Sequence, residues 1–469
     1  MLRKLTKTSR GQQIGLVPEP ILGCRPVLPF ALTLAGIAAL AVVVGSFSAP
    51  APGPVATHQV GSRPSGPSQI SSRAALSLVI RRAQERLHIF PADKETWAGL
   101  GSAYRQQARI TGDPTYYPKA EGALKRSLAL EPSTNWEAMT GLGALANARL
   151  DFAQALRWAR TATAVNPYDS SAYGVMDDAL TQLGDYPGAS AALQKMLALQ
   201  PGIPSFTRAA SQFEERGDPI SARKYLSRAL NQATERSDLA FCRYYLGELA
   251  FNGGDPKAAF GQYQLGLRTD PSSEPLLAGR AKAEAALGRT AAALNDYATV
   301  IDRVPQPQYI LEYAELLLSL GRDDEAQRQL DLLAAEQKLL ATNGVLNALT
   351  TAVVEADHGS ATTAVRQAET EWSRRRSVIV ADALGWALHR AGRDREALGY
   401  ATRANRFGGR NAGFRYHLGM IELALDHRAE ARRQLGTALK INPYFSVLQA
   451  PIARRALAAT AVEAPRGRR

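Results

Sequence analysis

Side chains able to bind metals or attack substrates are few and scattered along this 469-residue chain. The two cysteines, Cys24 and Cys242, lie far apart and form no Cys-x2-Cys pair that could hold zinc. The six histidines contain no His-Glu-x-x-His motif; they are His58, His88, His358, His389, His417 and His427. A Walker-type phosphate loop is also missing from the sequence. The sequence therefore predicts no metal, no cofactor, no small-molecule substrate and no enzyme activity.

The distribution of charged residues argues against nucleic acid as a binding partner. The formal net charge is +13, but much of the net positive charge lies in the first 26 residues and in residues 446–469, and the long body between them is close to balance. A nucleic-acid partner requires a basic stripe on the folded surface. One basic run, "WSRRRS" at 372–377, is either a solvated helix end or a contact for an acidic partner.

An apolar segment near the N-terminus predicts one membrane-spanning helix. Residues 27–47 carry no charge and are long enough to cross a hydrocarbon core of roughly 30 Å. The basic residues of segment 1–26 place that end in the cytoplasm, so the body is expected outside it. Residues 48–71 are rich in Pro, Gly and Ser and predict a flexible linker. A cleaved signal peptide, giving a secreted protein, is the alternative to a signal anchor.

The body of the chain repeats with a period of about 34 residues. One ruler is a small residue expected at the start of each second helix, spaced by 33 to 38 residues: Ala155, Ala189, Ala222, Ala259, Ala293, Ala326, Ala364, Ala397 and Ala431. A second ruler is a proline that ends six of the hairpins, since proline cannot continue a helix: Pro132, Pro167, Pro201, Pro271, Pro305 and Pro443. The two rulers predict ten helical hairpins with a capping helix before and after them.

The sequence of the first repeat resembles the tetratricopeptide repeat family. Trp97, Leu100, Gly101 and Tyr104 fit its pattern W-x2-L-G-x2-Y. The Leu-Gly step recurs at 142–143, 246–247, 384–385 and 418–419. The resemblance implies an all-α fold, a right-handed superhelical α-solenoid of tandem helix-turn-helix repeats over residues 72–458. The expected transmembrane helix precedes this solenoid, and residues 459–469 are expected to form a basic disordered tail.

The first hairpin departs from that pattern. Leu100 and Ala120 are 20 residues apart, against 13 from Leu142 to Ala155, so "ARITGDPTYYP" carries a seven-residue insertion. We expect a plain surface loop, with a functional loop as the alternative.

The resemblance also implies that the first helices line a concave groove for peptide ligands. Residues opposite the Leu-Gly face would then form two exposed stripes of aromatic and polar side chains, typical of binding anchors. The first stripe is Phe241, Tyr244, Glu248, Phe251 and Asn252, and the second is Trp386, His389, Arg390 and Tyr416. The alternative is that these aromatics pack against the neighbouring hairpin.

We therefore expect a non-enzymatic scaffold, anchored to the membrane, that presents this groove to protein or peptide partners outside the cytoplasm. An alternative is an accessory subunit of a cell-envelope biosynthesis or export complex.

Overall fold

The computed structural model describes residues 73–460, and every regular element among them is an α-helix. The segments expected at 1–26, 27–47 and 48–71 lie outside the described residues, and so does the expected tail of 459–469 from residue 461 onward. Ala459, predicted to belong to that tail, is instead the last residue of the final helix. The helices are α1 (Arg73–Ile89), α2 (Lys94–Thr111), α3 (Tyr116–Leu130), α4 (Trp136–Ala148), α5 (Phe152–Val165), α6 (Ser170–Leu183), α7 (Tyr186–Leu199), α8 (Ile203–Glu215), α9 (Pro219–Gln232), α10 (Arg236–Asn252), α11 (Pro256–Thr269), α12 (Glu274–Ala286), α13 (Thr290–Arg303), α14 (Pro307–Ser319), α15 (Asp323–Thr342), α16 (Ala348–His358), α17 (Ala361–Arg374), α18 (Val378–Arg390), α19 (Asp394–Ala404), α20 (Ala412–Ala424), α21 (Arg428–Ile441) and α22 (Gln449–Ala459).

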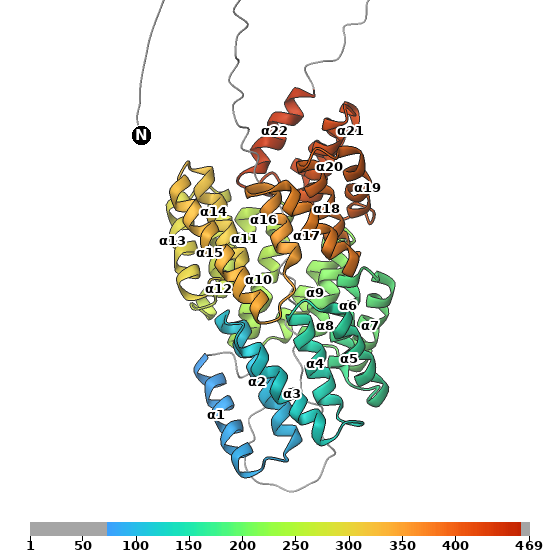
Figure 1. The fold of residues 1–469 in the computed structure, drawn as a ribbon. Coiled ribbons are helices and arrows are strands. Elements are labelled where there is room, and N and C mark those ends of the chain that lie inside the picture. The colour runs from blue at the N-terminus through green and yellow to red at the C-terminus, as the bar shows by residue number, and fades with distance from the viewer. Residues whose placement is uncertain (1–72, 461–469) are drawn as a thin grey trace, which may run out of the picture. The chain divides into compact units, whose positions relative to one another are not determined.

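Consecutive helices pair into ten hairpins, from α2–α3 to α20–α21, with α1 and α22 at the two ends (Figure 1). Most first helices also pack against the first helix of the next hairpin, for example α10 against α8 and α12. The expected all-α solenoid of tandem hairpins is therefore confirmed. No helix within residues 73–460 is both long and apolar enough to span a membrane.

Small residues hold the two helices of each hairpin close together. All nine alanines of the sequence ruler are at most 1% exposed, and so is Ala120 of the first hairpin. Three of the Leu-Gly glycines, Gly101, Gly143 and Gly385, face these alanines across the hairpin. A Cβ added to Gly385 would lie 3.0 Å from the Ala401 nitrogen and 3.2 Å from the Ala397 oxygen. A larger side chain at these positions would force the two helix backbones apart.

The Gly-Asp dipeptides end one helix and begin the next. Gly184, Gly217 and Gly254 adopt positive φ angles of 86°, 77° and 83°, a conformation that costs glycine little. The following aspartates cap the second helices, because their carboxylates accept hydrogen bonds from backbone N–H groups in the first turn. Asp185, for example, accepts from the Gly188 N–H at 3.0 Å. The acidic turns therefore serve the helix ends.

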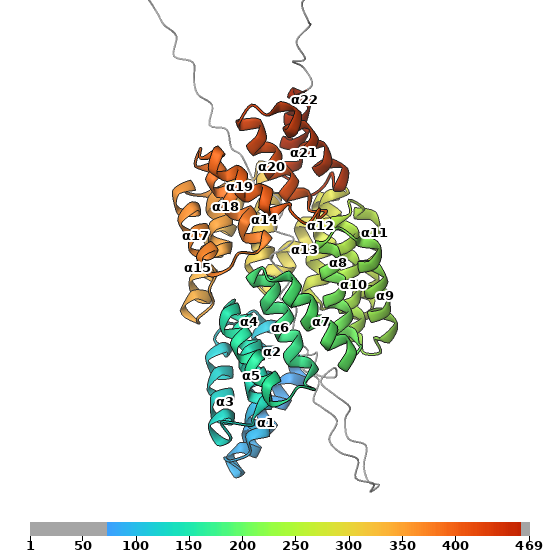
Figure 2. The same ribbon diagram turned by 90° about the vertical axis from the view of Figure 1, so that its right-hand side faces the viewer.

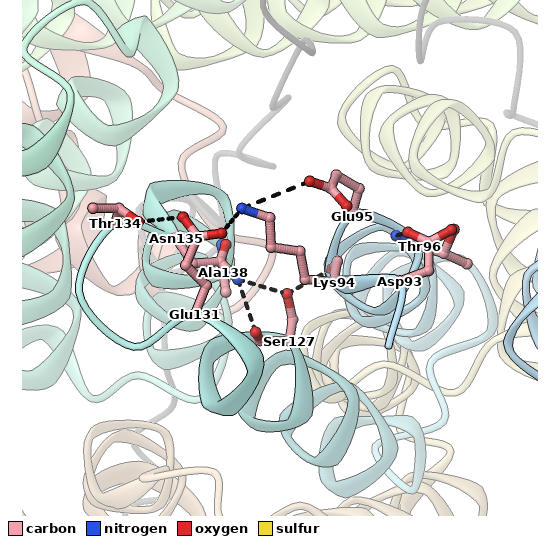
Figure 3. A network of polar contacts seen from close by, with 9 residues as sticks. All are labelled: Asp93, Lys94, Glu95, Thr96, Ser127, Glu131, Thr134, Asn135 and Ala138. Atoms are coloured by element: carbon pink, nitrogen blue, oxygen red, sulfur yellow. Dashed lines mark hydrogen bonds and ion pairs between the residues drawn. The ribbon is translucent and has the colours of Figure 1, made fainter. Parts of the chain in front are cut away.

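Polar contacts also join successive hairpins, as at the junction of α2, α3 and α4 in Figure 3. The buried side-chain amide of Asn135 donates to the carbonyl and the hydroxyl oxygen of Ser127 at 2.8 and 2.9 Å. The Ser127 hydroxyl donates to the Lys94 carbonyl at 2.7 Å, and the Lys94 ammonium pairs with Glu131. Asn135 also caps α4 through the Ala138 N–H. These contacts fix the second hairpin against the first.

The chain winds back onto itself after about six hairpins. The Leu346 N–H donates to the Arg149 carbonyl at 2.9 Å, and the Arg376 N–H donates to the Leu183 carbonyl at 3.3 Å. Further on, the side-chain amide of Asn442 donates to the Phe251 carbonyl at 2.8 Å. Each contact joins the turn inside an early hairpin to the loop before a much later helix. Figures 1 and 2 accordingly show the later, orange helices beside the earlier, green ones.

Candidate binding cavity

A cavity of about 1480 Å³ lies inside this winding. Its wall includes residues of the first helices α2, α8, α10, α12 and α14, and residues 442–447 and α22 add a further part. Aromatic side chains are prominent in the wall; they include Tyr117, Phe241, Tyr244, Tyr245, Phe251, Tyr297, Tyr309, Tyr444 and Phe445. The volume exceeds the 300–1,000 Å³ typical of small-molecule pockets, so the cavity has room for a larger ligand.

The first predicted stripe lies at this cavity. Phe241, Tyr244, Phe251 and Asn252 all line it, although Phe251 is only 5% exposed. Glu248 is buried just behind them, so its expected exposure was wrong. Its carboxylate accepts a hydrogen bond from the Tyr263 hydroxyl at 2.5 Å and two from the Lys282 ammonium at 2.7 and 3.0 Å.

Lys282 also lines this cavity. Its ammonium lies 4.8 Å from the centre of the Phe251 ring, a cation–π distance, and remains paired with Glu248. Burial lowers the pKa of Lys282, but the carboxylates of Glu248 and Glu312 raise it more, and the net change is a rise. Lys282 is therefore held in its charged form.

Carboxylates occupy the wall on both sides of this pair. Glu214 accepts a hydrogen bond from the Asn252 amide at 2.9 Å. Glu312 accepts from the Tyr297 hydroxyl at 3.1 Å and from the Gln308 amide. Burial is the main cause that raises the pKa of both carboxyls above the ordinary value for glutamate.

Two further carboxyls on the wall have strongly raised pKa values. Burial, together with the neighbouring Glu214, raises the pKa of Glu215 to about 7. Burial likewise raises the pKa of Glu315 to about 7, although the His358 ring 3.7 Å away acts in the opposite direction.

The second predicted stripe lies elsewhere. Trp386 and Tyr416 are 2% and 0% exposed, so the expectation that they are exposed was wrong. Trp386 stacks on the ring of His417 from the next first helix, with 4.2 Å between ring centres, and donates to Asp357 at 2.9 Å. These aromatics fill the space between successive hairpins, as the alternative interpretation held.

The two polar members of that stripe are half-buried and serve the same packing. The His389 ring contacts the Asp394 carboxylate at 2.5 Å, and the Arg390 guanidinium donates to the Ala356 carbonyl at 2.8 Å. Neither side chain is part of the cavity wall described above. The role of all nine predicted residues in binding a partner stays a prediction.

The insertion of the first hairpin lies in the cavity wall. It lengthens α2 to 18 residues, ended by Gly112 at φ 70°, and it adds a short loop before α3. Arg109, Ile110, Gly112 and Pro114 line the cavity, and a Cβ at Gly112 would lie 2.8 Å from Val304. The plain surface loop expected from the sequence is thus part of the inner wall, because the longer helix reaches the sixth hairpin.

Register along the repeats identifies wall residues that the sequence interpretation missed. Glu248 and Trp386 each precede the ruler alanine of their hairpin by eleven residues, and Lys282 and Glu315 do the same. Equivalent positions in a solenoid face the same side. Examining the position eleven residues before the ruler alanine in every hairpin would have identified Lys282 and Glu315.

Among residues 73–460, no group of three or more His, Cys, Asp and Glu side chains is arranged to hold a metal ion. Cys242 is fully buried, and burial raises the pKa of its thiol to about 12. A thiol in this state is a poor nucleophile at neutral pH.

Comparisons with known proteins return only distant structural similarity. No protein-family profile matches the chain, and no curated protein matches it. Among solved structures, yeast Tom70 is 12% identical, with 84% of this chain and 97% of that chain covered and a TM-score of 0.36. The human IFIT1 dimer with PPP-AAAA is 14% identical, with 80% and 92% covered and a TM-score of 0.44. A tetratricopeptide repeat protein from Parabacteroides merdae is 19% identical, with 55% and 98% covered and a TM-score of 0.33.

Proposed function

We propose that this protein is a non-enzymatic scaffold of the tetratricopeptide type, with right-handed winding, that binds a segment of a protein partner in its inner cavity. The observation that supports this function is a cavity of about 1480 Å³ whose aromatic side chains include residues of the first helices α10 and α14, the second helices α3 and α13, and the loop after α21. Aromatic side chains in a preformed concave wall can anchor a polypeptide because they bury large areas and lose little entropy on binding.

Site-specific photo-crosslinking tests this function. Benzoylphenylalanine placed at Tyr244, on the cavity wall, is expected to join a polypeptide partner in cells. The matched control is Tyr168, which is 80% exposed and lies in a loop outside the wall. Purified partner should then bind the Tyr244→Ala variant about tenfold more weakly, a loss of about 1.4 kcal/mol. The proposal is wrong if crosslinking at Tyr244 and at Tyr309 joins no polypeptide.

The membrane anchor is a second part of the proposal. Residues 27–47 lie outside the described residues, and support comes from their uncharged sequence and from the basic residues before them. The repeats then face away from the cytoplasm. Protease added to intact spheroplasts should digest the repeats, and digestion only after lysis would contradict this orientation. Recovery of a mature chain that lacks residues 1–47 would show a secreted protein instead.

A further inference from the structure

Four carboxylates of the cavity wall form a row, which we call the carboxylate row: Glu214 and Glu215 at the end of α8, and Glu312 and Glu315 on α14. The row flanks the Glu248–Lys282 ion pair, which joins α10 to α12. All four side chains are partly exposed, and all four line the cavity. A ligand in the cavity therefore has direct access to them.

Lysine and arginine side chains form no close ion pair with this row. Within residues 73–460, no Lys or Arg lies within ion-pair distance of the four carboxylates. Lys282 occupies the repeat position equivalent to that of Glu315, and both of its short contacts go to Glu248. The Glu215 side chain has neither a hydrogen bond nor an ion pair in this part of the chain, and Glu315 has only the His358 contact.

The enclosing wall is a second, independent feature that selects the ligand. Tyr244, Tyr245 and Tyr309 line the cavity together with the row. Aromatic faces attract ammonium and guanidinium groups and also accommodate the apolar stems of Lys and Arg. An anionic segment would face repulsion from the row, whereas a cationic one would gain charge-assisted hydrogen bonds.

We infer that the occupant of the cavity is an extended polypeptide segment carrying Lys or Arg side chains, whose cationic groups bind to the carboxylate row. This inference rests on the function proposed above and specifies the chemistry of the partner. The wall also carries Arg109, Arg303, Arg410 and Arg454, which come from α2, α13, the loop before α20 and α22. The basic side chains of the segment therefore belong at the row, between α8 and α14.

Protonation of the row gives this inference a second readout. Burial and the neighbouring Glu214 raise the pKa of Glu215, and Arg216 acts in the opposite direction. Burial, Asp357 and Glu312 raise the pKa of Glu315, and His358 acts in the opposite direction. A bound cation favours the ionised carboxylates, so binding releases protons near pH 7. The affinity for a basic segment should therefore increase from pH 6 to pH 8.

Peptide binding to the full-length chain in a neutral detergent tests the inference. The probes are three fluorescein-labelled peptides of one length, in which Leu and Ser alternate with Lys, with Glu or with Gln. We expect the Lys peptide to bind saturably, about tenfold or more tighter than the Glu peptide. Replacing all four row carboxylates by Gln should remove this preference. The control Glu396→Gln removes an exposed carboxylate of α19, outside the wall, and should change nothing.

The outcomes separate the two proposals. Equal affinity for the three peptides, or an unchanged preference in the Gln variant with native circular dichroism, overturns the basic partner and leaves the peptide-binding scaffold standing. Failure of every peptide to bind, combined with no crosslink at either Tyr244 or Tyr309, overturns both. Spermine is the probe for a free polyamine: if it binds the row while no polypeptide is crosslinked, the inference of a protein segment is wrong.

Discussion

At the scale of single residues, one repeat position carries different chemistry in successive hairpins. It holds Glu248 in α10, Lys282 in α12, Glu315 in α14 and Trp386 in α18. Glu248 of the fifth hairpin and Lys282 of the sixth neutralise each other, and Glu315 faces the cavity with His358 beside it. Trp386 instead fills the gap between hairpins. The neighbours on the adjacent first helices decide the role of each residue.

Glu215 should make the stability of the protein depend on pH. Folding raises the pKa of this carboxyl from the ordinary 4.5 to about 7, so the folded state holds the proton more tightly than the unfolded state. Below pH 4.5 both states are protonated and the residue costs nothing. As pH rises from 4.5 to 7, the unfolded state ionises first, and the free energy of unfolding falls. At pH values above 7, Glu215→Gln should raise the free energy of unfolding by roughly 1 to 3 kcal/mol, and at pH 4.5 it should have little effect.

Urea denaturation at several pH values measures this effect. The control is Glu396→Gln, because Arg393 lowers the pKa of Glu396 through a hydrogen bond and the pair is exposed. This control should show no stabilisation at high pH. A pH-independent effect of Glu215→Gln would contradict the assignment of a raised pKa.

At the scale of helices, close approach inside each hairpin depends on glycine and alanine. In the ninth hairpin, Gly385 of α18 faces the backbone of α19, and Gly399 of α19 has no atom within 4 Å of an added Cβ. The two glycines therefore differ in packing although both lie in helices of one hairpin.

Gly385→Ala should destabilise this hairpin and Gly399→Ala should stabilise it. The new methyl group at position 385 must displace the α19 backbone, at a cost of about 1 to 3 kcal/mol. At position 399 the substitution lowers the entropy of the unfolded chain and should contribute about 0.5 to 1 kcal/mol. Hydrogen exchange of the α18 and α19 amides measures both changes. Equal effects of the two substitutions would contradict the close approach.

At the scale of the whole described chain, the return of late loops onto early turns encloses the cavity. Gly254 lies at one such contact, where an added Cβ would meet the Ile441 oxygen at 2.7 Å. Gly288 occupies the same kind of turn two helices later, with φ 76° and no atom within 4 Å of an added Cβ. Gly254 and Gly288 therefore share a left-handed backbone conformation, but only Gly254 lies against another part of the chain.

Gly254→Ala should therefore cost more than Gly288→Ala. Each substitution places alanine in the left-handed region, which costs about 1 to 2 kcal/mol. Gly254→Ala should also separate the fifth hairpin from residues 441–443. The free energy of unfolding of this variant should therefore fall by about 1 kcal/mol more than that of Gly288→Ala. Hydrogen exchange should rise at Asn442 in this variant alone. The closure would be disproved if both variants left exchange at Asn442 unchanged.

The sequence by itself determined the hairpins, because their signals are local. Apolar spacing, Leu-Gly steps and the regular alanines place each helix pair, and Gly-Asp turns and prolines place the ends. The division of the chain into domains at 1–26, 27–47 and 48–71 depends on residues that the structure does not describe, and it stays a prediction. For the first stripe, the repeat register was enough to bring Tyr244 and Asn252 to the cavity wall.

Only the tertiary structure decided which first-helix faces are open and which are covered. Periodicity assigns the same side to Tyr244 and Trp386, but packing between later hairpins buries Trp386 and leaves Tyr244 at the cavity. The contact of Asn442 with Phe251 spans 191 residues, and no local pattern encodes it. The curvature that closes the cavity accumulates from small rotations at every hairpin interface, so it becomes visible only when all the hairpins are packed together.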